Sequence, residues 1–441
     1  MRIILMFIYL SRLEGKCLTG FLKKSIVERR SLGKFKNQDQ KPGAARFAGM
    51  TGQEEQEMQP LRALILSGGG GRGAFHAGVY KYLMQAEKPG LDVEHAGVWD
   101  PQVVVGTSIG AVNGAAIVQG MTPQELEQIW IDLQEKDIQG LPPGMRSLGR
   151  WAARRVFREL IGADLPQVPP ELSATRPPSK FWPPLPLLPG WLGEKLIGRW
   201  INLLDTGPLR QTLVRKMRFD AAKLAASQKT LLIAATNVQT GERTMFSNRP
   251  ILRRETGQAR EDIHPGINVD RIVASCSIPL VYPWTYDAPT RAFYWDGAVV
   301  ANTPLGSAFD AFGDAPMDVP VEVVVVLMTP WWKAGQTPPH GARQMPESFG
   351  DAITWALDWV LLASFRERLR LIEAYNRFAM QERAQGSGPY QYRQVKILIV
   401  APSEFLPAAR IIDYDRDKSI ELIQMGYEAA KRVFESEFGI R

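Results

Sequence analysis

The chain has 441 residues, 45% of them hydrophobic, which is enough for a large α/β core and excludes a disordered or fibrous protein. No apolar run reaches the roughly 18 residues of a membrane-spanning helix, so we expect no transmembrane segment. Two cysteines are too few for a disulfide framework, so we expect a cytoplasmic location, or a peripheral one at a membrane. Residues 1–50 carry a charge of +8, from 11 Lys and Arg residues against three acidic ones, so the rest of this +7 chain is −1. The basic pI therefore gives no indication of the basic face on a folded domain that a nucleic-acid partner requires, and we expect no such partner.

Residues 1–60 are predicted to form a flexible basic N-terminal arm. Ile3–Leu10 is apolar but too short for a secretory signal and is followed by charged residues, and no sustained period continues to residue 59. Such a segment can place apolar side chains in a bilayer interface while its basic residues meet anionic headgroups. Because Met50 and Met58 precede the first strand, an untranslated leader is the open alternative.

The next part of the chain alternates between strand-like and helical segments. Ala74–Gln85 and Ala111–Val118 are predicted helices. Short apolar runs rich in β-branched residues predict strands buried on both faces, namely Leu61–Ser67, Val103–Val105, Leu231–Thr236, Val321–Met328 and Val395–Ala401. This alternation predicts an α/β fold with a mostly parallel central sheet covered by helices.

Two further segments follow other patterns. Between residues 140 and 208 lie 12 of the 32 prolines and four tryptophans, which predicts an insertion that is either a lipid-facing cap or a surface excursion packed on the body. Residues 331–441 are expected to supply helix and strand elements packed on the preceding domain. Within them, Ala352–Ala384 has apolar residues at helical spacing and predicts one long helix, packed on the sheet or facing a membrane.

The segment Gly106-Thr107-Ser108-Ile109-Gly110 has the GxSxG pattern of a nucleophile elbow. It follows a strand and precedes a helix of small residues, so the turn pushes the serine out of the sheet edge, and the flanking glycines avoid collisions with neighbouring backbone. The N-terminus of the following helix adds positive potential where an oxyanion would form. Ser108 is therefore the candidate nucleophile.

A second glycine-rich segment, Gly68–Gly73 (GGGGRG), directly follows the first strand. Its unshielded backbone N–H groups can converge on an anion such as a tetrahedral intermediate. The same letters fit the GxGxxG of a dinucleotide-binding fold, with Asp92 or Glu94 about 20 residues on. That alternative expects a strand ending in the acidic residue, which the sequence does not offer, and leaves the turn at Ser108 unexplained.

A serine nucleophile needs a base, and the four histidines are poorly placed to supply it. After Asp296 only His340 remains, in a loop of Pro, Gly and Gln, and His76 sits early in a helix where packing suffices as a reason. Tyr294-Trp295-Asp296-Gly297-Ala298 offers a carboxylate after a short aromatic strand, with a turn at Gly297. Partial burial would raise its pKa toward neutrality, as a general base requires.

Taken together, Gly68–Gly73, Gly106–Gly110 and Asp296-Gly297-Ala298 resemble the three signatures of the patatin-like phospholipase family, in the family's order. The similarity covers about residues 61–330, which the resemblance marks as the catalytic domain. It continues in several shorter segments: Asp205–Leu213, Ala234–Asn237, Thr240-Gly241-Glu242, Ala274–Pro279 and Asn302-Thr303-Pro304.

The resemblance implies a three-layer α/β/α sandwich that hydrolyses acyl esters through an acyl-serine intermediate, without a metal or organic cofactor. Ser108 would be the nucleophile and Asp296 its base. Gly106 and Gly110 would form the elbow, Gly297 and Ala298 would complete the Asp motif, and the oxyanion hole would use Gly68, Gly69, Gly70, Gly71, Arg72, Gly73 and Ile109.

The implied activity is that of a phospholipase A or lysophospholipase acting on a lipid or membrane-surface substrate. A neutral-glyceride lipase, a general esterase of the same fold and a non-catalytic lipid-binding scaffold are the open alternatives. Neither the lipid, the acyl position nor the oligomeric state follows from these residues.

Overall fold

The structure is a computed structural model that describes residues 59–92, 95–140, 202, 204–333, 335–339, 345–346, 349–386 and 389–439. Most of the predicted basic arm and nearly all of the proline-rich insertion lie outside the described residues, as do Cys17, Glu94 and His340. The described residues belong to one compact unit, Met58–Arg441.

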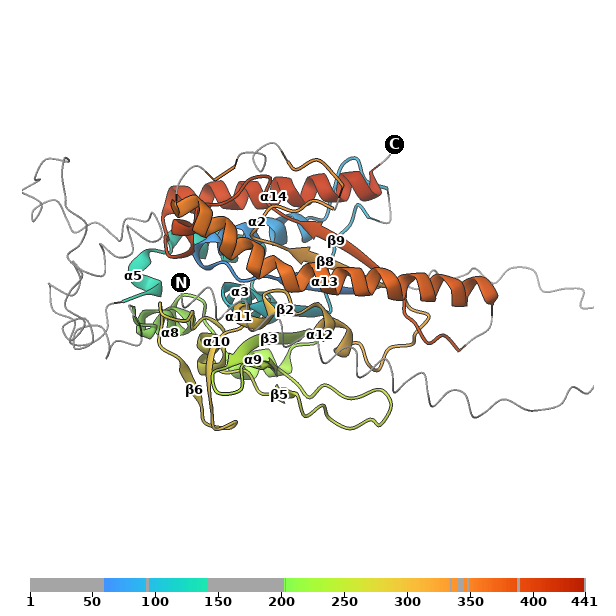
Figure 1. Cartoon of the computed structure of the whole chain (residues 1–441), viewed down its shortest axis with the longest axis horizontal. Helices are drawn as coiled ribbons and strands as arrows, with labels where there is room; N and C mark the ends of the chain where they lie inside the picture. The colour runs from blue at the N-terminus through green and yellow to red at the C-terminus, as the bar shows by residue number, and fades with distance from the viewer. Residues whose placement is uncertain are drawn as a thin grey trace, which may run out of the picture. The chain divides into compact units, whose positions relative to one another are not determined.

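A nine-stranded sheet runs through the described part of the chain (Figure 1). Its main order is β5-β4-β3-β2-β1-β8-β9, and β7 joins it through β3 and carries β6. The strands are β1 (Leu61–Leu66), β2 (Val103–Thr107), β3 (Thr230–Asn237), β4 (Arg243–Ser247), β5 (Ile263–Pro265), β6 (Thr285–Asp287), β7 (Ala292–Asp296), β8 (Val321–Val326) and β9 (Val395–Val400). The five strands from β3 to β9 in this order are mutually parallel, which confirms the predicted mostly parallel sheet.

Helices cover both faces of the sheet. They are α2 (Ala74–Leu83), α3 (Ile109–Val118), α4 (Pro123–Asp132), α5 (Glu135–Ile138), α8 (Gly207–Arg215), α9 (Ala221–Ala226), α10 (Val269–Ser275), α11 (Ala298–Ala301), α12 (Leu305–Asp310), α13 (Phe349–Gln385) and α14 (Arg416–Phe438), with 3-10 turns η2 (Gly70–Gly73) and η5 (Ala408–Ile411). The predicted long helix is confirmed as α13. None of the described helices is long and apolar enough to cross a membrane.

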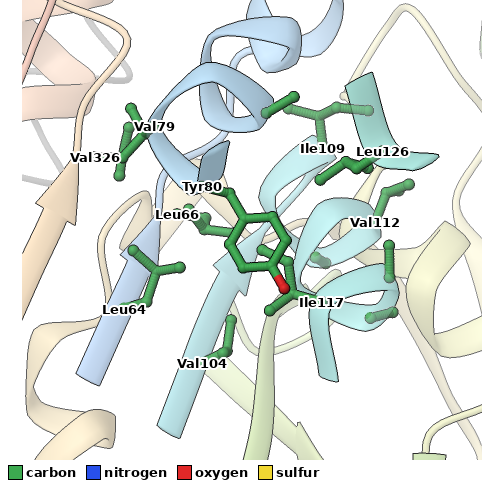
Figure 2. Packing of buried hydrophobic residues seen from close by; sticks show 14 of the residues in the cluster. Leu64, Leu66, Val79, Tyr80, Val104, Ile109, Val112, Ile117, Leu126 and Val326 are labelled. Carbon is green, nitrogen blue, oxygen red and sulfur yellow. The ribbon is translucent and has the colours of Figure 1, made fainter. Parts of the chain in front are cut away.

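Alternate residues of the central strands point into two separate cores. Leu64 and Val104 belong to the core shared with α2, α3, α4 and α14, and Figure 2 shows them beneath Val79 and Ile117. Ile65 belongs to the other core, which α12 and α13 close. Because both faces are buried, strands β1, β2 and β8 are mostly apolar, with Arg62 and Glu322 near the starts of β1 and β8 as exceptions, and the fold has the expected three α/β/α layers.

The hairpin of β6 and β7 was only partly expected from the sequence, and it positions the candidate site. Ala235 and Thr236 of β3 pair with β4 on one edge and with β7 on the other, so β7 lies on the same edge of β3 as β2. Thr107, the last residue of β2, is opposite Ala234, and Asp296, the last residue of β7, is opposite Ala235. The ends of β2 and β7 therefore meet beside β3.

Candidate active site

Ser108 occupies a strained turn between β2 and α3. Its backbone has φ 56° and ψ −127°, in the left-handed half of conformational space that a residue with a side chain rarely adopts. The turn is tight enough that a Cβ at Gly106 would collide with the carbonyl oxygen of Gly110, and one at Gly110 with that of Leu66. The two glycines of the elbow are thus required by close backbone approach, as the motif predicts.

Asp296 lies at the end of β7 with its side chain buried. Oδ1 accepts a hydrogen bond from the Ala298 N–H at 2.8 Å, whereas Oδ2 has no hydrogen-bond partner among the described residues. Burial raises the pKa of this carboxyl to about 7, against the lowering effects of the Ser108 side chain and the Ala298 amide. A carboxyl that titrates near neutrality, next to a serine hydroxyl and with one oxygen unengaged, can accept a proton from that hydroxyl.

Ser275, at the end of α10, connects the turn at Ser108 to β3, and the residues that follow it contact Asp296. Its Oγ accepts a hydrogen bond from the Ser108 N–H at 2.8 Å and donates one to the Ala234 carbonyl at 2.6 Å. Asp296 N–H donates to the carbonyl of Ser277, two residues further on. Sequence reasoning assigned no role to Ser275, although it lies in one of the segments that resemble the family.

The glycine loop lies directly against the nucleophile. A Cβ at Gly68 would come within 3.1 Å of the Ser108 Cβ, and the Gly68 N–H donates to Oδ1 of Asn302 at 2.8 Å. Asn302 follows the Asp296 motif, so this bond joins the loop to the carboxylate's segment. Since the Gly68 amide is engaged here and the Arg72 amide donates to the Gly69 carbonyl, the amides that could meet an oxyanion are those of Gly69–Gly71 and of Ile109. As the first residue of α3, Ile109 has no intrahelical acceptor for its N–H.

Arg72 connects the glycine loop to α13 and to the segment around Leu406. Its guanidinium donates to Asp358 of α13 at 3.1 Å and to the Leu406 carbonyl at 2.6 Å, and both side chains of the ion pair are almost fully buried. Its backbone N–H donates to the Gly69 carbonyl. The guanidinium thus ties the glycine loop to the outer helix layer, whereas Gly73 is held by the Asn113 side chain, which donates to its carbonyl at 3.0 Å.

The described histidines are engaged elsewhere. His76 is buried in α2, where its Nδ1 accepts from the Asn113 amide at 3.1 Å and burial lowers its pKa to about 3. His95 is paired with Asp92 and stacks on Phe438, and His264 lies on β5. Asp92, one of the two acidic residues considered for the dinucleotide alternative, lies in a loop, and the next strand after the glycine loop, β2, ends at Thr107 and not at an acidic residue.

Cys276 is buried and adjoins the candidate pair. Burial and the Asp296 carboxyl raise the pKa of its thiol, while the Ser108 side chain lowers it. The thiol is therefore protonated near neutral pH and contributes apolar bulk beside the nucleophile.

Comparisons with known proteins show what this chain is similar to. Among curated proteins, the chain is 21% identical over 249 residues to the cGAMP-activated phospholipase of Escherichia coli (strain TW11681). The aligned residues make up 55% of this chain and 53%, about half, of that protein. Among solved structures, VipD from Legionella pneumophila matches with 12% identity and a TM-score of 0.38, over 86% of this chain and 67% of that chain. The family model of patatin-like phospholipases matches residues 64–309, more than half of the chain. The chain therefore belongs to the patatin-like phospholipase family, whose members hydrolyse ester bonds.

Proposed function

We propose that this protein is a serine-dependent lipid acyl hydrolase of the phospholipase A or lysophospholipase kind, with Ser108 and Asp296 as its catalytic dyad. The observation that carries the proposal is the buried Asp296 carboxyl, whose pKa of about 7 and unengaged Oδ2 suit it to accept the proton of the adjacent Ser108. The strained conformation of Ser108 supports the same role, because such strain is concentrated at functional sites.

In the acylation step, ionised Asp296 accepts the hydroxyl proton as Ser108 Oγ forms a bond to the acyl carbonyl carbon. The carbonyl oxygen becomes an oxyanion, which backbone N–H groups of the Gly69–Gly71 stretch and of Ile109 would stabilise at the N-terminus of α3. Collapse of this intermediate breaks the bond to the alcohol, which leaves with the proton returned by Asp296. The product is an acyl-serine and a deacylated lipid or alcohol.

Deacylation repeats the same chemistry with water as nucleophile. Asp296 accepts a proton from water while the water oxygen attacks the acyl carbon, and Ser108 leaves with that proton. Both steps require the carboxyl to be ionised before attack and protonated after it. A pKa near the working pH allows both, since neither protonation state is then costly.

The test is covalent labelling by a fluorophosphonate probe together with turnover of phospholipid, lysophospholipid and triglyceride substrates. The wild type should be labelled and should release fatty acid from one of the phospholipid classes, and Ser108→Ala should do neither. Preferred turnover of triglyceride would favour a neutral-glyceride lipase. A wild type that is neither labelled nor active would instead indicate a lipid-binding scaffold.

A further inference from the structure

The hairpin that carries Asp296 also exposes aromatic side chains. Trp284, Tyr286 and Phe293 are between 37% and 48% exposed, although side chains of this size are usually covered in a soluble domain. Their rings are in contact, with centroids 5.0 Å apart for Tyr286 and Phe293 and 6.2 Å apart for Trp284 and Phe293. We call these three residues the hairpin aromatic face.

This face is the outer side of a hairpin whose inner side is firmly anchored. Tyr286 is directly opposite Phe293 in the β6–β7 register, and the residues that alternate with them are buried. Asp287 forms a buried ion pair with Arg271 of α10 at 3.0 Å. Packing and this ion pair therefore stabilise the inner side of the hairpin. The alternation of side chains along the strands then directs the three aromatic rings outward.

Charge along the same segment is compatible with a lipid surface. Residues 280–300 are all described, and their two carboxylates, Asp287 and Asp296, are both buried. The one basic residue of this stretch, Arg291, is exposed at the hairpin turn. An exposed cluster of Trp, Tyr and Phe with a cation and no exposed carboxylate in this stretch matches the composition found at membrane–water interfaces.

The hairpin aromatic face and the candidate site share strand β7. Phe293 precedes Asp296 by three residues on one strand, which corresponds to roughly 10 Å. Val299 and Val300, just beyond Asp296 on α11, are also exposed, as is Leu280 before the hairpin. A bilayer in contact with the hairpin would thus meet the same strand that ends at Asp296.

We propose that the hairpin aromatic face, with Arg291, is the surface by which this protein docks on a phospholipid bilayer. The proposal rests on the proposed lipid hydrolase function and names the partner of the same site. The aromatic rings enter the interfacial layer of the bilayer, and the guanidinium meets lipid phosphates.

The experiment is co-sedimentation of the full-length protein with phosphatidylcholine vesicles containing 20% phosphatidylglycerol. The double variant Trp284→Ser/Phe293→Ser should bind about tenfold more weakly or worse, because two interfacial anchors are lost. The matched control is Leu371→Ser/Phe378→Ser, which removes two similarly exposed apolar side chains from α13. Loss in the hairpin variant alone supports the proposal; equal sedimentation of wild type and hairpin variant, or equal loss in both variants, overturns it.

Two conservative variants keep the test valid if the serine variant does not fold. Brominated phosphatidylcholine should quench the fluorescence of the wild type more than that of Trp284→Phe, and an equal loss of signal would contradict insertion. Arg291→Gln should lower affinity for the anionic vesicles about fivefold and leave neutral vesicles unaffected. If the hairpin variants dissociate an oligomer but still sediment with vesicles, the face is a protein interface and the proposal is wrong.

Sedimentation does not depend on turnover, so this result is separate from that for the proposed function. Hydrolysis of a soluble short-chain ester by the wild type and by Ser108→Ala tests the dyad without any membrane. A protein that turns over the soluble ester but binds vesicles equally well without the aromatic rings would keep the proposed function and lose the docking surface.

Discussion

Replacement of Asp296 by asparagine separates the chemical role of the carboxyl from its structural cost. The amide has the same shape, and its oxygen can still accept the Ala298 N–H, but it cannot accept the Ser108 proton. We therefore expect turnover of a soluble ester to fall by roughly 10³-fold or more, as is usual when a general base is removed.

The same substitution should stabilise the fold at alkaline pH. Folding raises the pKa of Asp296 from 3.8 to about 7 because the side chain is buried. The folded protein therefore binds this proton more tightly than the unfolded chain, and stability declines as the pH rises between these two values. A shift of about three pKa units corresponds to about 4 kcal/mol in the free energy of unfolding, which is an upper limit for the gain in Asp296→Asn, since the buried amide also loses hydration.

Two measurements test this reasoning. Urea unfolding of wild type and Asp296→Asn at pH 8.5 and pH 5 should show the variant more stable at pH 8.5, with a smaller difference at pH 5. In the wild type, kcat/KM should fall on acidification with a midpoint near pH 7, since only the ionised carboxyl acts as base.

The matched control for activity is His340→Ala, which should remain close to wild-type activity because the dyad needs no histidine. If His340→Ala is inactive while Asp296→Asn is merely impaired, a catalytic triad replaces the dyad. A variant that is less stable than the wild type at pH 8.5, or a kcat/KM that does not change between pH 5 and 8, would refute the role of the buried carboxyl.

Substitutions at four further positions test other parts of the structure. Ser108→Ala should lower turnover by about 10⁴-fold or more, and Ser108→Gly should be equally inactive but more stable than the alanine variant by about 1 kcal/mol, because glycine relieves the strain at φ 56°; equal melting temperatures would contradict this. Ser275→Ala should lower kcat about tenfold or more with little change in KM, since the Ser108 N–H loses its acceptor, and an unaltered kcat would remove Ser275 from the support of the nucleophile. Gly78→Ala should destabilise the protein by about 1–3 kcal/mol, because its Cβ would overlap the Ile423 carbonyl of α14, whereas Gly306→Ala, with open space around it, should be neutral or slightly stabilising in thermal unfolding.

Elements with a strong local signal could be predicted from the sequence. Both faces of β1 and β8 are buried, so their apolar runs identify them without tertiary information, and α13 follows from apolar residues at helical spacing that reach the core at Leu362 and Phe365. The turn around Ser108 was predicted for the same reason, since Gly106 and Gly110 are needed by backbone that lies within a few residues or in the adjacent strand.

What could not be predicted depends on contacts between distant segments. The strands β4, β5 and β6 are short and carry weak patterns, and nothing in the local sequence indicates that β7 continues the edge of β3 where β2 ends. That pairing brings Asp296 next to Ser108 across nearly 190 positions of the chain, and its burial there raises the carboxyl pKa to about 7. Ser275 and Asn302 likewise have a role only because folding places a single backbone N–H group within reach of each side chain. Residue types and spacing thus indicate which groups are available, whereas desolvation and hydrogen-bond geometry, which decide their chemistry, arise only in the folded chain.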